Sequence, residues 1–72
     1  MLLANLTGPT LLALCADLTR MVLPGGHVVL SGILQAEADV VLQAFQARGF
    51  TLRETLLEEE WAAFWLTKVN HA

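Results

Sequence analysis

A proline followed by two glycines, Pro24-Gly25-Gly26, separates two segments of opposite character in the first half of this chain. Proline lacks the backbone N–H that a helix interior requires, and glycine readily adopts the left-handed conformation that ends a helix. Apolar residues recur at helical spacing before this break, whereas residues 27–30 after it form an apolar-rich run with two valines. A run that is apolar at successive positions is typical of a strand buried on both faces of a parallel sheet. The break therefore predicts a helix that leads into a buried strand of an α/β domain.

The same reasoning predicts two amphipathic helices, one on each side of that strand. Thr7 and Pro9 suit the start of the first helix, which we expect to end near Leu23. In this interpretation Ser31-Gly32 ends the strand, and Gly49 ends the second helix. Apolar residues at intervals of three and four mark one face of each helix. They are Leu11, Leu14, Cys15, Leu18 and Val22 in the first, and Leu34, Ala38, Val41, Leu42 and Phe45 in the second.

Three further segments fit strands. Residues 1–4 are apolar and, taken alone, could form a strand or a helix. Residues 50–56 alternate between apolar and polar up to Leu56, which predicts a strand with one buried face and Glu54 as its exception. After the charged turn Glu58-Glu59-Glu60, residues 61–66 are apolar on both faces. This last strand should therefore lie inside the sheet.

The resulting order of elements is β-α-β-α-β-β, which belongs to the α/β fold class. Helical crossovers are right-handed and leave the connected strands parallel, whereas a tight turn makes the last two strands antiparallel. An interior last strand has to insert between the second and the third, so the spatial order becomes first, second, fourth, third. We expect residues 1–72 to form a single domain with a partial Rossmann-like sheet.

The composition is that of a folded chain that is more apolar than a small domain can bury by itself. Hydrophobic residues make up 56% and charged residues 15% of the 72 residues, the opposite of a disordered chain. A mean hydropathy of +0.58 is high for so small a domain, which indicates that a partner covers part of its surface. The net charge of −3 and the four scattered basic residues argue against nucleic-acid binding.

The chain is expected to be cytoplasmic. Cys15 is the only cysteine, and its place in a helical apolar stripe fits a reduced, unreactive core thiol. The N-terminus lacks the basic start of a signal peptide, and Asp17 and Arg20 interrupt the best candidate for a membrane-spanning run. No membrane association is expected.

Several short motifs follow one another in an order that resembles the ribosomal protein L11 methyltransferases, a class I family that depends on S-adenosylmethionine. They are Leu3-Ala-Asn-Leu6, Gly8-Pro9, Leu23-Pro-Gly-Gly26, Leu30-Ser-Gly-Ile-Leu34, Gly49-Phe50 and Glu60-Trp61. The resemblance covers almost the whole chain. It implies that the chain corresponds to the last quarter to third of the full-length enzyme. This part would contain the half of the methyltransferase sheet that ends in an antiparallel hairpin.

The resemblance also implies a role for Asn5, at the carboxyl end of the first strand, where ligands of open α/β sheets bind. Its carboxamide oxygen would accept a hydrogen bond from the substrate amine and orient the nitrogen for methyl transfer. Asn5 and Leu6 would contact the cofactor S-adenosylmethionine, and ribosomal protein L11 would be the substrate. The family's glycine-rich cofactor turn, its ribose-binding acidic residue and its N-terminal substrate domain are not in this sequence. We therefore expect the chain alone to be inactive.

A function of another class stays open: a non-catalytic assembly module that forms a homodimer through its exposed first strand. In that case Asn5 is only a turn residue before the helix. Ser31 and Gly32 lie beside the same crevice, where Gly32 would permit the close approach of a ligand or of backbone, but a plain strand-to-helix turn is the favoured interpretation.

The remaining polar and aromatic candidates favour structural roles. Consecutive residues such as Glu58-Glu59-Glu60 rarely converge on one metal ion, and His27 and His71 lack metal-ligand spacing. No metal site is expected. The aromatic residues of the last strand, Trp61, Phe64 and Trp65, are assigned to the core.

Overall fold

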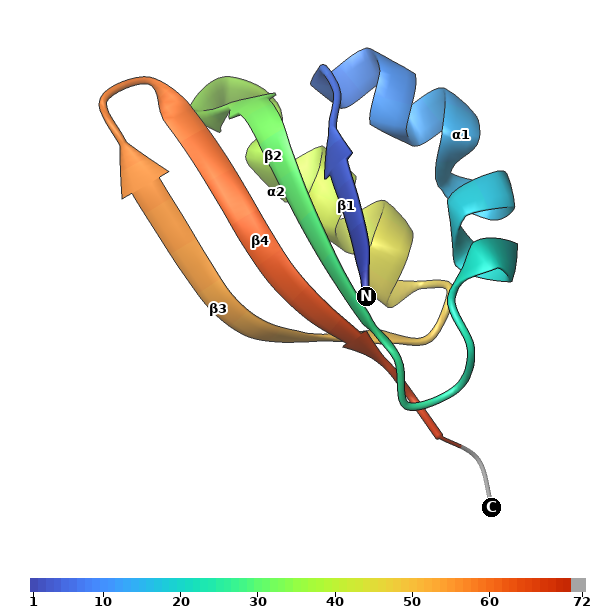
Figure 1. The fold of residues 1–72 in the computed structure, drawn as a ribbon. Helices are drawn as coiled ribbons and strands as arrows, with labels where there is room; N and C mark the ends of the chain where they lie inside the picture. The colour runs from blue at the N-terminus through green and yellow to red at the C-terminus, as the bar shows by residue number, and fades with distance from the viewer. Residues whose placement is uncertain (71–72) are drawn as a thin grey trace.

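The chain folds into one layer of strands with two helices packed on it (Figure 1). The computed structural model describes residues 1–70. Its elements are β1 (Leu2–Asn5), α1 (Gly8–Met21), β2 (His27–Leu34), α2 (Gln35–Gln46), β3 (Phe50–Glu58) and β4 (Trp61–Lys68). The predicted order of elements is confirmed. Neither helix among residues 1–70 has the length and hydrophobicity that a membrane span requires.

The four strands form one sheet in the order β1-β2-β4-β3, as the sequence predicts. β1 and β2 are parallel, and β4 is antiparallel to both β2 and β3. The last strand of the chain therefore lies inside the sheet, and β3 forms an edge. The carboxyl ends of β1 and β2 meet at one end of the sheet, where Asn5 pairs with Ser31.

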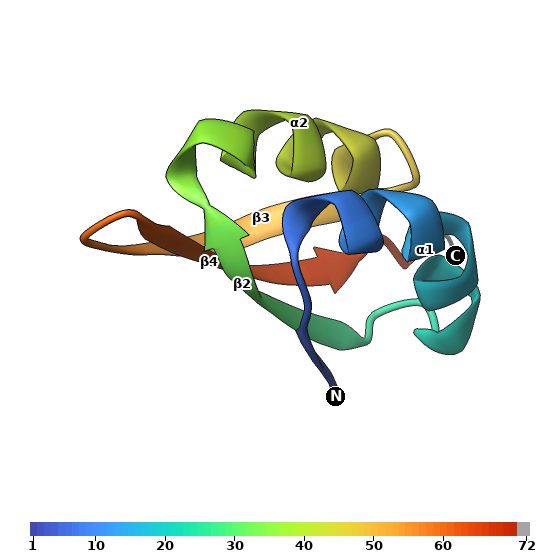
Figure 2. The same ribbon diagram turned by 90° about the horizontal axis from the view of Figure 1, so that it is seen from above.

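Both helices pack on the same face of the sheet (Figure 2). The largest fully buried side chains are Phe45, Leu11, Leu30, Ile33, Leu66, Val28 and Val41. The apolar stripe of α1 is confirmed at Leu11, Cys15 and Leu18, whereas Leu14 is 37% exposed; Val22 is buried just beyond the end of the helix. The other face of the sheet carries no helix among the described residues, and we call it the open face.

The prediction that Ser31-Gly32 ends the second strand is wrong, because β2 continues to Leu34. The pairing of β2 with β4 shifts register between Leu30 and Ile33, so Ser31 and Gly32 form a β-bulge. Gly32 has φ +81°, a left-handed conformation that favours glycine. Because the strand continues, α2 begins only at Gln35, and Leu34 pairs with Trp61 instead of joining the helical stripe.

The predicted buried face of the third strand is correct for Phe50 but wrong for Leu56, which is 64% exposed. A register shift between Leu52 and Glu54 places one extra residue in β3. Beyond this bulge the alternation is reversed, so Leu56 and Glu54 turn to the open face, since directly opposed residues in antiparallel strands share a face.

The assignment of Trp61 and Trp65 to the core is also wrong, although that of Phe64 is correct. Ala62, Phe64 and Leu66 lie under the helices and are buried. Trp61 and Trp65 alternate with them on the open face and are 46% and 37% exposed. An apolar run shows that both faces avoid water, but not that the same chain covers both.

Candidate functional site

The candidate site lies at the carboxyl ends of β1 and β2. Asn5 is exposed there, opposite Ser31 in the parallel register. The Leu6 N–H donates a hydrogen bond to the Ser31 carbonyl oxygen at 3.1 Å, which extends the pairing one residue beyond β1. Leu6 also packs against the core. Asn5 is thus held between a paired strand and a packed residue, with its side chain accessible to a ligand.

Gly32 makes room for the Asn5 side chain. A Cβ placed on Gly32 would lie 2.6 Å from Asn5 Oδ1 and 3.1 Å from the Leu6 carbonyl oxygen. A Cβ essentially never approaches another atom as closely as the shorter of these distances, so the carboxamide occupies space that the side chain of any other residue would take, and it would have to turn away. Gly32 therefore permits the close approach of the Asn5 side chain and the Leu6 backbone, and it does so within a bulged strand and not in the favoured strand-to-helix turn.

A hollow of about 320 Å³ adjoins Gly32 at this end of the sheet. Its lining residues are Thr7, Pro9, Gly32, Leu34, Glu37 and Trp61. Glu37 is half-buried, and a Cβ placed on Gly8 would lie 3.0 Å from its Oε1, so its carboxylate sits at the N-terminus of α1. The hollow therefore combines one carboxylate, one indole and an apolar wall beside the Asn5 carboxamide.

The β3–β4 hairpin is fastened to the same end of the sheet. The Gln35 N–H donates to the Glu60 carbonyl oxygen at 2.8 Å, and Gln35 Nε2 donates to the Glu59 carbonyl oxygen at 2.6 Å. These two bonds hold the turn and place Trp61 against the hollow. Sequence reasoning missed Trp61 as a site residue, because it treated the apolar run after the acidic turn as core.

The other predicted candidates lie apart from the site or have structural roles. Within residues 1–70 no group of three metal-ligating side chains converges. His27 lies at the amino end of β2, where its Nδ1 accepts a hydrogen bond from Trp65 Nε1 at 3.0 Å. His71 lies outside the described residues. Cys15 is buried, and this burial raises the pKa of its thiol despite the nearby Arg48 and Thr19.

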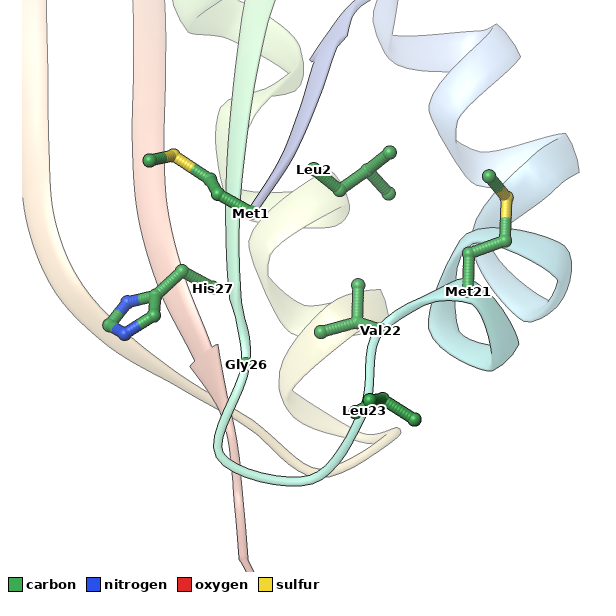
Figure 3. Close-up of a pocket in the computed structure, with 7 residues that line it drawn as sticks. All are labelled: Met1, Leu2, Met21, Val22, Leu23, Gly26 and His27. Atoms are coloured by element: carbon green, nitrogen blue, oxygen red, sulfur yellow. The ribbon is translucent and has the colours of Figure 1, made fainter.

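A second cavity, of about 270 Å³, lies at the opposite end of the sheet (Figure 3). It is lined by Met1, Leu2, Met21, Val22, Leu23, Gly26 and His27. It adjoins the amino ends of β1 and β2, whereas ligands of open α/β sheets bind at the carboxyl ends. We therefore do not assign the candidate site to this cavity.

The fold and the placement of Asn5 define a class: part of a mixed α/β sheet that ends in an antiparallel hairpin, with its polar side chains at the carboxyl ends of parallel strands. A crystal structure of ribosomal protein L11 methylase from Lactobacillus delbrueckii subsp. bulgaricus matches 94% of this chain with a TM-score of 0.86. The two sequences are 22% identical, so this likeness concerns the fold.

The sequence profile of the family Ribosomal protein L11 methyltransferase (PrmA) matches residues 1–69, and the chain belongs to this family. A ribosomal protein L11 methyltransferase from Brucella abortus (strain S19) is 39% identical over 93% of the chain. One from Geobacter metallireducens is 45% identical over 83% of the chain. The chain spans 24% and 20% of the length of these two relatives and 35% of the solved structure.

The close packing at Gly32 can be tested by comparing two alanine substitutions. Gly32→Ala and Gly49→Ala both place alanine at a positive φ, of +81° and +94°, which costs about 1–2 kcal/mol. Only the Cβ at position 32 meets neighbouring atoms; nothing lies within 4 Å of the one at position 49. We expect Gly32→Ala to lower the free energy of unfolding by up to about 1 kcal/mol more than Gly49→Ala, because the Leu6 carbonyl oxygen, a backbone atom 3.1 Å from the added Cβ, has to move. Urea denaturation measures both, and equal losses would contradict the close packing of Gly32 against the Leu6 backbone.

Proposed function

We propose that this chain is the carboxyl-terminal part of the catalytic domain of a cytoplasmic methyltransferase, which transfers a methyl group from S-adenosylmethionine to amino groups of ribosomal protein L11. The observation that carries the proposal is the exposed Asn5 carboxamide at the carboxyl end of β1, packed on Gly32, in a chain that belongs to this family over residues 1–69. The buried free thiol of Cys15 supports a reducing compartment.

Asn5 acts in this proposal by positioning the substrate. Its Oδ1 accepts a hydrogen bond from an N–H of the substrate amine, which leaves the nitrogen lone pair directed at the methyl donor. Holding two reactants in line is a large part of what an enzyme contributes to a displacement reaction. Leu6, whose N–H is engaged with Ser31, keeps the Asn5 backbone fixed while the side chain turns to the ligand.

The described residues fit one end of S-adenosylmethionine and not the other. Asn5, Leu6 and the hollow beside Gly32 suit the end from which the methyl group leaves. S-adenosylmethionine supplies an electrophilic methyl group on a sulfonium. Its ribose and purine need a glycine-rich turn and an acidic residue at neighbouring strand ends, and residues 1–70 provide no such pair. The resemblance thus supports a segment that completes a cofactor site built mainly elsewhere.

The uncovered surfaces of the chain support the same view. β1 pairs with β2 on one side only, and its Leu3 side chain is 71% exposed. The open face presents Trp61 and Trp65 without a covering helix among the described residues. Strands that are apolar on both faces normally lie between two layers. We infer that further sheet and a second layer complete the domain, and that the chain alone is inactive.

The role of Asn5 is testable in a chimera in which this chain replaces the matching carboxyl-terminal segment of the Geobacter metallireducens relative. Asn5→Ala should lower kcat for methyl transfer to ribosomal protein L11 about 100-fold, because the amine loses its positioning partner. Transfer of labelled methyl from S-adenosylmethionine measures this. Asn70→Ala is the matched control. Asn70 follows β4 and lies beside Gly25 of the α1–β2 connection, away from the candidate site. Equal activity of the two variants would remove Asn5 from the mechanism.

Cofactor binding by the chain alone gives an independent test. Calorimetry with millimolar S-adenosylmethionine should show no binding heat, because the chief nucleoside contacts are not among its residues. The chimera serves as the positive control. Micromolar affinity of the isolated chain would show that residues 1–72 hold a cofactor site of their own.

The free edge of β1 favours a second candidate, an assembly module that forms a homodimer. Its unpaired backbone groups can bond to the same strand of a second copy and continue the sheet across a twofold axis. The exposed Leu3 and Met1 side chains would then pack against that copy. Light scattering at micromolar concentration should then give the mass of a dimer. A monomer under these conditions would rule out this second function.

A further inference from the structure

On the open face, two glutamates of β3 each lie directly opposite a tryptophan of β4. In the antiparallel register of β3 and β4, Glu54 lies opposite Trp65, Leu56 opposite Ala63, and Glu58 opposite Trp61. Directly opposed residues point to the same side of a sheet, so the six side chains form one array. The bulge in β3 is what brings the glutamates to this face.

The middle of this array is a shallow apolar depression between the larger side chains at its ends. Ala63 lies between the two tryptophans along β4, and its small side chain leaves a depression that Leu56 borders. Two adjoining hollows, of about 150 and 190 Å³, share Leu56 and Ala63 in their linings. The first also includes Glu58, Trp61 and Gly32, and so reaches the floor on which Asn5 rests. We call these two hollows the hairpin groove.

One of the two tryptophans already holds a cation. The Arg53 guanidinium lies 5.9 Å from the centroid of the Trp65 ring, and the Nε1–H of the same indole donates to His27 Nδ1 at 3.0 Å. Trp61 has no corresponding partner among residues 1–70. The same residues provide no ion pair for Glu58, since the salt bridge they form is Arg20–Asp17. The chain thus shows a filled cation position at one end of the groove and an open one at the other.

We propose that Glu58 and Trp61 bind a cationic side chain of the protein substrate, carried on a segment that lies in the hairpin groove next to the amine to be methylated. An indole face attracts an ammonium or guanidinium group, and a carboxylate beside it adds a charge-assisted hydrogen bond. Four of the seven acidic residues of the chain, Glu54, Glu58, Glu59 and Glu60, lie on or beside this hairpin and favour a basic partner. The inference rests on the proposed function and names the feature of the substrate that the chain recognises.

Peptide binding to the 72-residue chain tests the inference without cofactor or methyl transfer. The probe is the acetylated and amidated pentapeptide Ala-Lys-Ala-Lys-Ala, and the control carries Nε-acetyl-lysine at both lysine positions. We expect the lysine peptide to shift the Trp61 indole N–H resonance and the acetylated peptide to bind several-fold more weakly. Glu58→Gln should weaken binding about threefold, as expected for an exposed cation contact. Glu59→Gln removes the same charge in the same turn but outside the groove, and should have a smaller effect than Glu58→Gln.

Four results would overturn the inference: no binding at millimolar peptide, equal binding of both peptides, equal effects of Glu58→Gln and Glu59→Gln, or shifts that bypass Trp61. If the same shifts grow with protein concentration in the absence of peptide, a second copy occupies the groove instead. The amide spectra report in the same samples whether each variant is folded. Since this assay is independent of Asn5 and S-adenosylmethionine, it can succeed where the methyl-transfer test fails, and the reverse.

Discussion

The β-bulge at Ser31 and Gly32 is the feature on which both the core and the candidate site depend. Leu30 and Ile33 are three residues apart, a spacing that puts side chains on opposite faces of a regular strand. Both are nevertheless fully buried beneath the helices, because the bulge reverses the alternation between them. The same Gly32 leaves the space that Asn5 Oδ1 occupies. One missing side chain therefore serves the packing of the core and the position of the site residue.

A second bulge, in β3, has the opposite effect on the hairpin. It turns Leu56 away from the helices and aligns Glu54 and Glu58 with the tryptophans of β4. Together with the two hydrogen bonds from Gln35 to the turn, it orients the outer end of the hairpin over the carboxyl end of β2. The open face owes its mixture of indoles and carboxylates to this one extra residue.

The sequence predicted the order of the elements and of the strands, because these follow from features that are visible locally. The Pro24 break and the change from helical to alternating period mark the elements, and the two-sided apolar character of residues 61–66 places β4 inside the sheet. An extra residue in a strand has no such mark, so the sequence alone places the end of β2 at Gly32 and not at Leu34. Glu54, which interrupted the alternation of residues 50–56, was the visible sign of the second bulge.

For the site, sequence reasoning singled out Asn5, Leu6 and Gly32 individually, but their contact depends on a parallel pairing between residues far apart in the chain. Trp61 was assigned to the core for a related reason. Apolar side chains on both faces of a strand show what each face prefers, and only the three-dimensional arrangement shows that the helices of this chain cover one of them.

The open face sets a constraint on whatever covers it. Near Val29 and Trp65 it carries the Glu54 side chain, but a cation is already present there, because Arg53 lies over the indole of Trp65. At the outer end of the hairpin the carboxylate of Glu58 lies beside Trp61, and burying an unpaired carboxylate under an apolar layer would cost several kcal/mol. A covering layer can therefore close the first region but has to leave the second open or bring a cation to it. The second region adjoins Gly32 and Asn5, so the end of the sheet that resists apolar covering is the end at which a basic substrate could reach the proposed positioning residue.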